Sequence, residues 1–250
     1  MTQNRERHFS TLLSQPLAGS DLHIWCASLN VSPEDLSHYL SLLSPDEKTR
    51  AQRFYFEIDR NHFIVGRGLL RTILGCYLNI EPARIEFVYG QYGKPALKPG
   101  LHDQVLEFNL SHSKDMALYI FSLNRKIGID IEYIHSMPNM DKFAEEFFSL
   151  GENTFIDSLP ENQKLDALFK IWTCKEAFLK ANGFGLTVPI NQVEISLESE
   201  QSTRLLSIGG DQEQAARWHL ETFIPVTGYQ ASLAFEGHAG QVILRRLNDS

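Results

Sequence analysis

Three carboxylates, a lysine and a histidine have side chains that could do chemistry on a phosphorylated substrate. Asp130 and Glu132 lie two residues apart in IGIDIE, and Glu176 and Lys180 lie four apart in WTCKEAFLK. Carboxylate oxygens are the hard ligands that Mg²⁺ prefers, and Mg²⁺ usually completes its shell with water and substrate phosphates. Lys180 would face the same phosphates, and His112 could contact a phosphate or relay a proton. These residue types predict a magnesium site that acts on a diphosphate substrate.

The two acids of IGIDIE share one face of a strand predicted over residues 126–134. The strict alternation of the segment places Ile127, Ile129 and Ile131 on the opposite face. Neighbouring carboxylates on one face repel each other unless a cation neutralises them, although a solvated strand face would also explain them. Gly128 lies on the face of the acids and could leave room there for a ligand.

A helix is predicted over residues 166–186, and it carries the second pair of candidate residues. Its apolar residues recur at helical spacing: Leu168, Ile171, Trp172, Phe178 and Leu179. Gly183 stands where a left-handed C-cap would end the helix. Trp172, Glu176 and Lys180 are four apart and therefore share one side of the helix. On this segment alone, a surface ion pair between Glu176 and Lys180 explains the spacing at least as well as a site does.

The remaining elements alternate between strands and helices in an order that occurs twice. Strands are expected near residues 21–29, 84–89, 105–113, 116–123, 193–197, 217–224, 229–235 and 241–247. Helices are expected near residues 33–43, 45–53, 60–78, 141–148 and 151–159, a loop at 90–100 and a hairpin connection at 209–214. We therefore predict two similar halves, residues 1–125 and 126–250, that share an interface.

Composition limits the classes of partner. The chain has 250 residues, 43% of them hydrophobic, and a formal net charge of −8. An acidic protein has little overall attraction for nucleic acid or an anionic membrane, so any anion site has to be local. Three widely spaced cysteines lack the spacing of a zinc site, and the first residues lack an apolar signal region. A cytoplasmic protein is expected.

One region is locally basic. Between Pro45 and Thr72 there are six Lys/Arg against four Asp/Glu, and Arg67 and Arg71 lie four apart on a predicted helix. A solvated helix face explains such an excess about as well as an anion site does. Within the same region Ser44 and Glu47 have the spacing of a capping box.

Six motifs between residues 44 and 190 together resemble the phosphopantetheinyl transferases of the Sfp type, most closely the cyanobacterial members. The motifs are RFYF at 53–56, GRGLLR at 66–71, YGKP at 92–95, FNLSHS at 108–113, IGIDIE at 127–132 and WTCKEAFLK at 172–180. Each is weak alone, but GIDIE followed by WxxKEAxxK is highly specific. The final sixty or so residues match only in length and in their strand-rich character.

The resemblance implies a fold and an activity. The fold would be α+β, a monomer of two similar α/β halves related by a pseudo-twofold axis, with coenzyme A and Mg²⁺ bound between them. The enzyme would transfer the 4′-phosphopantetheine of coenzyme A to a serine of an apo acyl or peptidyl carrier protein. Adenosine 3′,5′-bisphosphate would be released, and the carrier would serve fatty-acid, polyketide or nonribosomal-peptide synthesis.

The resemblance also assigns roles to individual residues. Asp130, Glu132 and Glu176 would be the metal ligands, Lys180 would grip the pyrophosphate, and Glu176 or His112 is a candidate base. The remaining assignments are to coenzyme A: Tyr92, Gly93, Lys94 and Pro95 in the nucleotide pocket, Ser111 and His112 at the phosphates, and Arg50 at the 3′-phosphate.

Two positions depart from the family pattern. Glu47 stands where some members have lysine, and His62 stands where some have arginine. If Glu47 is only the capping-box acid, the missing charge at the 3′-phosphate could come from another base: Lys48, Arg53 or Arg60.

Two other functions remain open. A non-catalytic module that binds coenzyme A or a carrier protein would keep the fold, although the retained acids and Lys180 argue against it. A magnesium-dependent hydrolase of diphosphate nucleotides would need only the carboxylates. An acidic carrier protein could dock after Ser136 or on the phenylalanines 143, 147 and 148, although residues of that type are more typical of a core.

Overall fold

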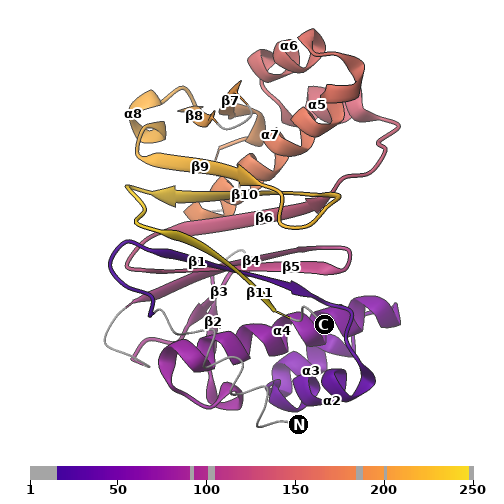
Figure 1. The fold of residues 1–250 in the computed structure, drawn as a ribbon, viewed down its shortest axis with the longest axis vertical. Coiled ribbons are helices and arrows are strands. Elements are labelled where there is room, and N and C mark those ends of the chain that lie inside the picture. The colour runs from indigo at the N-terminus through magenta and orange to yellow at the C-terminus, as the bar shows by residue number, and fades with distance from the viewer. Residues whose placement is uncertain (1–15, 91–92, 101–104, 184–187, 200–201, 248–250) are drawn as a thin grey trace.

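The structure, a computed structural model, describes residues 16–90, 93–100, 105–183, 188–199 and 202–247. Its elements stack as a helical layer, a sheet, a second sheet and a second helical layer (Figure 1). Helices and strands are mixed along the whole chain, and the predicted α+β class is confirmed. Tyr92 lies outside the described residues.

The elements follow a similar order on either side of residue 125, with α8 and β11 as additions in the second part. The first half contains β1 (Leu22–Ser28), α2 (Pro33–Leu42), α3 (Pro45–Ala51), α4 (Glu57–Leu78), the 3₁₀ turn η1 (Pro82–Arg84), β2 (Phe87–Tyr89), β3 (Pro95–Leu97), β4 (Leu106–Ser113) and β5 (Met116–Leu123). The second contains β6 (Ile127–Tyr133), α5 (Met140–Phe147), α6 (Leu150–Ser158), α7 (Glu161–Asn182), η2 (Ile190–Gln192), β7 (Val193–Ser199), β8 (Ser202–Ile208), α8 (Gln212–Ala215), β9 (Trp218–Phe223), β10 (Tyr229–Glu236) and β11 (Val242–Leu247).

The two main sheets have corresponding strand orders. The first is ordered β11-β1-β5-β4 and the second β6-β10-β9, so β1, β5 and β4 match β6, β10 and β9. The exception is β11, which pairs in parallel with β1 and places Val242 opposite Leu22. The division of the chain near residue 125 stays a prediction, and β11 lies in the sheet of the first half.

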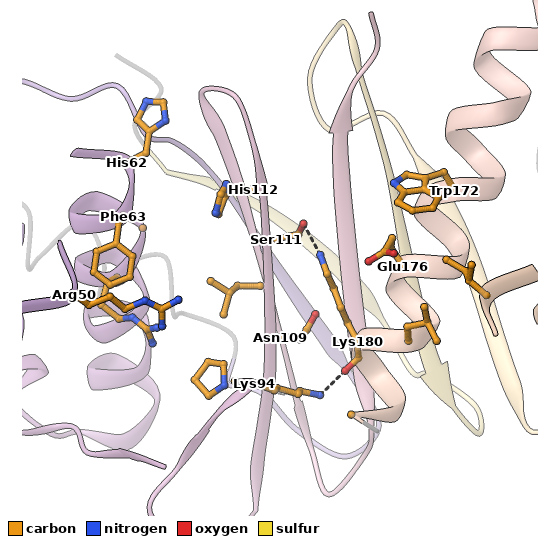
Figure 2. A pocket seen from close by; sticks show the side chains of 18 of the residues that line it. Arg50, His62, Phe63, Lys94, Asn109, Ser111, His112, Trp172, Glu176 and Lys180 are labelled. Carbon is orange, nitrogen blue, oxygen red and sulfur yellow. Dashed lines mark hydrogen bonds between the residues drawn. The ribbon is translucent and has the colours of Figure 1, made fainter. Parts of the chain in front are cut away.

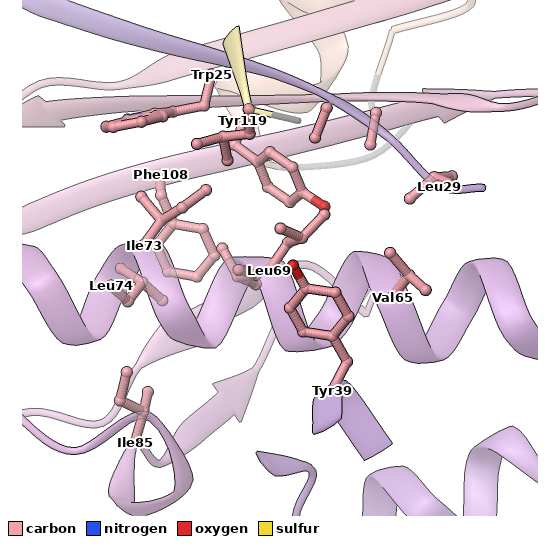
Figure 3. Packing of buried hydrophobic residues seen from close by; sticks show 14 of the residues in the cluster. Trp25, Leu29, Tyr39, Val65, Leu69, Ile73, Leu74, Ile85, Phe108 and Tyr119 are labelled. Atoms are coloured by element: carbon pink, nitrogen blue, oxygen red, sulfur yellow. The ribbon is translucent and has the colours of Figure 1, made fainter. Parts of the chain in front are cut away.

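Apolar side chains hold the layers together. The inner faces of the sheets pack on each other, with Ile127, Ile129 and Ile131 of β6 against Leu118 and Ile120 of β5. The alternation predicted for β6 is confirmed. On the outer face of the first sheet, α4 packs its apolar side against β1 and β5 (Figure 3). The helix α7 covers the second sheet in the same way.

The helix α7 is longer at its start than its sequence pattern suggested. It begins at Glu161, directly after Pro160, because a polar first turn is helical without adding to the apolar period. It ends at Asn182, and Gly183 adopts the left-handed conformation with φ 70°, so the predicted C-cap is confirmed. Residues 184–186, the end of the predicted segment, lie outside the described residues. None of the described helices is long and apolar enough to cross a membrane.

Short strands account for the main errors of the sequence analysis. The segment 84–89 was expected to be one strand, but η1 occupies its start and only Phe87–Tyr89 is extended. The expected loop at 90–100 contains β3, which pairs with β2. The expected hairpin connection at 209–214 leads from the unpredicted strand β8 into the short helix α8. These strands are too short or too irregular to show a period of two.

Gly128 is required for packing, and the expectation that it leaves room for a ligand is wrong. A Cβ atom added there would lie 2.0 Å from the carbonyl oxygen of Ala177 and 2.5 Å from the backbone nitrogen of Ala181. The backbone of α7 therefore occupies the space beside Gly128, and this contact brings Glu176 and Lys180 close to the acids of β6.

Each half buries one acid with the same structural role. Glu47 accepts a hydrogen bond from Arg71 Nε at 2.7 Å, and Glu152 accepts one from Lys175 Nζ at 2.7 Å. Each acid also accepts the N–H of the N-cap serine of its own helix, which completes a capping box. The capping-box interpretation of Glu47 is confirmed, and its buried carboxylate does not supply the positive charge of the family pattern.

Candidate active site

A pocket of about 660 Å³ is lined by residues of both halves (Figure 2). In Figure 2, His62 and Phe63 of α4 lie on one side, β4 crosses the middle, and Trp172, Glu176 and Lys180 of α7 lie on the other side. The pocket contains eight of the candidates: Arg50, Gly93, Lys94, Pro95, Ser111, His112, Glu176 and Lys180. Asp130 and Glu132 are not among the described lining residues, and they lie behind Ser111 and Ser113.

Alternate side chains of β4 hold the acids of β6 in place. Asn109 Oδ1 accepts a backbone N–H of β6 at 3.0 Å. Ser111 Oγ donates to Asp130 Oδ1 at 2.8 Å, and Ser113 Oγ donates to Glu132 Oε2 at 2.8 Å. Residues 109, 111 and 113 share one face of β4 because a strand has a period of two. The motif FNLSHS thus fixes the position of both carboxylates, and Asn109 is a site residue that the sequence analysis missed.

Lys180 forms its ion pair across to β6. Its Nζ lies 2.6 Å from Asp130 Oδ1 and donates to Ser111 Oγ at 2.8 Å. Among the ion pairs of the described residues, Lys180 has Asp130 as its partner and not its helix neighbour Glu176. The surface pair that helical spacing allowed is therefore not the arrangement formed.

The carboxylates of Asp130, Glu132 and Glu176 lie close enough to repel one another. Burial, followed by repulsion from Asp130, raises the pKa of Glu176, and the ammonium of Lys180 opposes this shift. Burial also raises the pKa of Glu132, with Asp130 adding to the shift and the bond from Ser113 opposing it. Three carboxylates thus gather around one lysine, an arrangement that a further cation would stabilise.

The chemistry of the acidic donors suits a hard divalent cation, although their side chains are not arranged around one. Asp130 is 2% exposed, and its Oδ2 atom has no hydrogen-bond partner in the described part of the chain. As the side chains stand, no three His, Cys, Asp or Glu groups of the described ranges are arranged to hold a metal ion. Lys180 supplies the counter-charge at Asp130 Oδ1, while Oδ2 remains an acceptor that no described donor or cation satisfies.

Two further cationic or titratable groups line the pocket. Lys94 Nζ donates to the carbonyl oxygen of Lys180 at 2.7 Å, near the C-terminal end of α7, where a positive charge is favourable (Figure 2). Burial lowers the pKa of Lys94. Desolvation by the surrounding protein, followed by repulsion from Lys180, lowers the pKa of His112, although the residue is exposed at the rim. Both effects disfavour the protonated form of the imidazole.

The side of the pocket near α4 carries two arginines. Arg50 lines it as expected, and Arg67, which the sequence analysis noted only for its spacing from Arg71, lines it too. Of the alternative bases, Arg53 lines an adjoining pocket with Arg50, and Arg60 pairs with Glu57 at 3.4 Å. Arg67 differs from the other bases of this region in being buried. Helical spacing alone does not predict this burial.

The phenylalanines proposed for carrier docking pack inside the second half. Phe148 is 3% exposed, and the rings of Phe143 and Phe147 lie 4.8 and 5.5 Å from Trp172. Phe147 and Trp172 also form a wall of the pocket. The structure supports their interpretation as core and pocket wall.

Comparison with known proteins gives consistent matches over most of the chain. Residues 126–234 match the family described as the 4′-phosphopantetheinyl transferase superfamily, and residues 27–122 match the family 4′-phosphopantetheinyl transferase, N-terminal. The 4′-phosphopantetheinyl transferase HetI of a Nostoc species is 37% identical over 90% of this chain and 92% of its own length. Sfp of Bacillus subtilis is 29% identical over 68% of this chain and 73% of its own.

Among solved structures, the holo-[acyl-carrier-protein] synthase of Thermotoga maritima matches with 24% identity and a TM-score of 0.37. This match covers 45% of the present chain and 62% of the synthase.

Proposed function

Because this chain belongs to the 4′-phosphopantetheinyl transferase superfamily, we propose that it transfers 4′-phosphopantetheine from coenzyme A to a serine of an apo carrier protein. The observation that carries the proposal is the acidic cluster of β6 and α7, joined to Lys180, at one side of a pocket with arginines at the other. Such a pocket suits a long substrate with a diphosphate and a further anionic group. Carriers of fatty-acid, polyketide or nonribosomal-peptide synthesis are the proposed acceptors, in the cytoplasm, with the transferase acting as a monomer.

Asp130, Glu132 and Glu176 would hold Mg²⁺. The partnerless Oδ2 of Asp130 and the mutual repulsion of the three acids support this assignment. When bound, Mg²⁺ would neutralise the charge of the diphosphate and polarise its phosphorus–oxygen bonds.

The protein's own residues would then position the reacting groups. Lys180 Nζ would contact a diphosphate oxygen, with Ser111 and Asp130 fixing the ammonium. The carrier serine Oγ would attack the phosphorus that bears pantetheine, and the bond to the adenosine bisphosphate would break. The serine proton would pass to a base, for which Glu176 is suited by its place in the pocket and its raised pKa, and His112, whose pKa is lowered, is the second candidate.

One assay separates this proposal from the alternatives. The protein is incubated with coenzyme A, Mg²⁺ and an apo carrier protein, and both products are measured by intact mass. Transfer gives a phosphopantetheine adduct on the carrier, whereas a binding module gives none and a hydrolase alters only the nucleotide. Excess EDTA is expected to abolish the adduct and added Mg²⁺ to restore it. An unmodified carrier across a panel of acyl and peptidyl types would refute the proposal.

Lys180→Met is expected to lower kcat for this transfer by about 10- to 100-fold, because methionine keeps the aliphatic stem but cannot donate to a phosphate oxygen. The measurement is initial rate with saturating coenzyme A and carrier. Lys164→Met is the control, since Lys164 lies on the same helix and pairs with Glu161 at 3.2 Å. An unchanged kcat in Lys180→Met would show that this lysine only pairs with Asp130 and does not take part in transfer.

A further inference from the structure

A group of basic side chains lies at one end of the second sheet, outside the pocket described above. Arg125 precedes β6, His219 is near the start of β9, and His238 follows β10. Antiparallel pairing brings these ends together, because Phe235 of β10 lies opposite both His219 and Ile127 (Figure 1). None of the three basic residues is among the described residues that line the pocket.

The three basic side chains gather around the ring of Phe235. The guanidinium carbon of Arg125 lies 5.9 Å from the centre of that ring. The His219 ring stacks on it, with centres 5.4 Å apart and planes at 15°. The His238 ring follows at 5.2 Å from that of His219. Because Phe235 is 3% exposed, the buried ring fixes the arginine and the first histidine beside each other.

These basic groups have no acceptors of their own. Within the described ranges, the side chains of Arg125, His219 and His238 form no hydrogen bond and no ion pair. The Nη1 atom of Arg125 is fully buried in this state. A guanidinium carries five N–H donors and each imidazole at least one, and donors removed from water are costly without acceptors. Such a group of donors indicates a ligand that supplies the acceptors.

Neighbouring acids do not neutralise the group. Glu221 and Glu236 lie on the same two strands, β9 and β10, and Asp21 precedes β1. None of these acids forms an ion pair in the part of the chain that the structure describes. The pKa of His219 agrees: burial lowers it first, repulsion from the other two bases lowers it further, and no acid raises it. The positive charge of the group is therefore not offset within the protein.

We propose that Arg125, His219 and His238 form a binding site for a tetrahedral oxyanion, either inorganic phosphate or a phosphate monoester. His238 is exposed and His219 partly exposed, so the ligand reaches the group from solvent. Donors from three side chains match several oxygens of one phosphate, whereas a carboxylate offers only two oxygens. The bound anion supplies both the acceptors and the negative charge that the group lacks.

The test follows the imidazole resonances of His219 and His238 by NMR while inorganic phosphate is added near neutral pH at constant ionic strength. Each resonance is assigned by its loss in His219→Gln or His238→Gln. In the wild-type protein both are expected to shift and to saturate with one dissociation constant. The resonance of His112, which lines the pocket, separately reports phosphate bound there.

Arg125→Gln is expected to weaken phosphate binding at the two histidines by about 10-fold or more, because the charged donor is lost. Arg84→Gln removes an exposed arginine of η1 and is the control, with wild-type affinity expected. Unchanged affinity in Arg125→Gln would overturn the proposal.

Two further ligands test the class of anion on the wild-type protein, so this result does not depend on the folding of a variant. Acetate is expected to bind about 10-fold more weakly than phosphate, since it has one oxygen fewer for the three side chains. Methyl phosphate separates the two sources: tighter binding than inorganic phosphate assigns the site to monoesters, and weaker or equal binding assigns it to the free ion. Equal affinity for acetate, or shifts that do not saturate with either phosphate, would overturn the proposal. Transfer of phosphopantetheine is not measured here, so failure of this site leaves the proposed function unchanged.

Discussion

Glu176→Gln is expected to lower kcat for phosphopantetheine transfer by about 100- to 1000-fold while the protein stays folded. The substitution keeps the size of the side chain but removes one of the three charges proposed to hold Mg²⁺, and it also removes the preferred candidate base. Glu176 lines the pocket and is only partly buried, so its loss leaves no cavity in the core. Transfer is measured by carrier mass at saturating coenzyme A and Mg²⁺.

The same substitution has a predictable effect on stability in EDTA. The pKa of Glu176 is raised in the folded protein, so its charged form is less favourable there than in the unfolded chain. The resulting loss of stability develops as the pH rises from the ordinary pKa of glutamate through the raised one. Near pH 7, metal-free Glu176→Gln is therefore expected to unfold at the wild-type temperature or above it, and the difference is expected to disappear at acidic pH.

The control variant for Glu176→Gln changes another glutamate of α7. Glu161→Gln removes an acid that is 84% exposed at the first turn of α7, and its kcat is expected to match the wild type. Near-normal transfer by Glu176→Gln would remove this residue from both of its proposed roles. Loss of activity together with a large drop in unfolding temperature would instead assign it a structural role.

Asp130→Asn is expected to lower kcat by about 1000-fold and, unlike Glu176→Gln, to lower stability as well. Asp130 is buried, and its Oδ1 accepts hydrogen bonds from both Ser111 and Lys180. Asparagine keeps the shape but removes the charge that pairs with Lys180, and we expect a loss of about 1–3 kcal/mol in the free energy of unfolding. Chemical denaturation and the carrier mass assay measure the two effects.

The double variant Asp130→Asn/Lys180→Met tests whether the pair acts as a unit. If the ion pair is the main contribution of each residue to stability, the combined loss is expected to be smaller than the sum of the single losses. Additive losses in the denaturation experiment would contradict this coupling. An Asp130→Asn protein with near-normal transfer would contradict the proposed metal site itself.

The sequence predicted correctly which candidate residues share one side of a strand or helix, because these features depend only on neighbouring residues. Alternation in IGIDIE gave the side of β6 that carries Asp130 and Glu132, and helical spacing placed Glu176 and Lys180 together on α7. The ion-pair partner of Lys180 could not be predicted in this way. Spacing within the helix favours Glu176, whereas folding brings Asp130 of β6 close to Lys180. Their assembly as a metal and coenzyme A site stays a prediction.

Features that depend on the meeting of distant segments escaped the sequence analysis. Gly128 looked like space for a ligand because its neighbour, the backbone of α7, is set by tertiary packing. Arg67 looked like one base among several because its burial depends on Phe87 and Tyr89, which lie on another element. The two-residue period of a strand can be recognised only over several residues. β2 and β3 have three residues each and were therefore not predicted correctly.

The position of β11 has a consequence for synthesis of the protein. β1 leaves the ribosome long before β11, yet one of its edges pairs with that strand, where Leu22 meets Val242. Until β11 has been translated, that edge presents unpaired N–H and C=O groups that another chain could extend. The first half therefore completes its sheet only after the second half has emerged, and shielding of β1 by a chaperone would matter most during that interval.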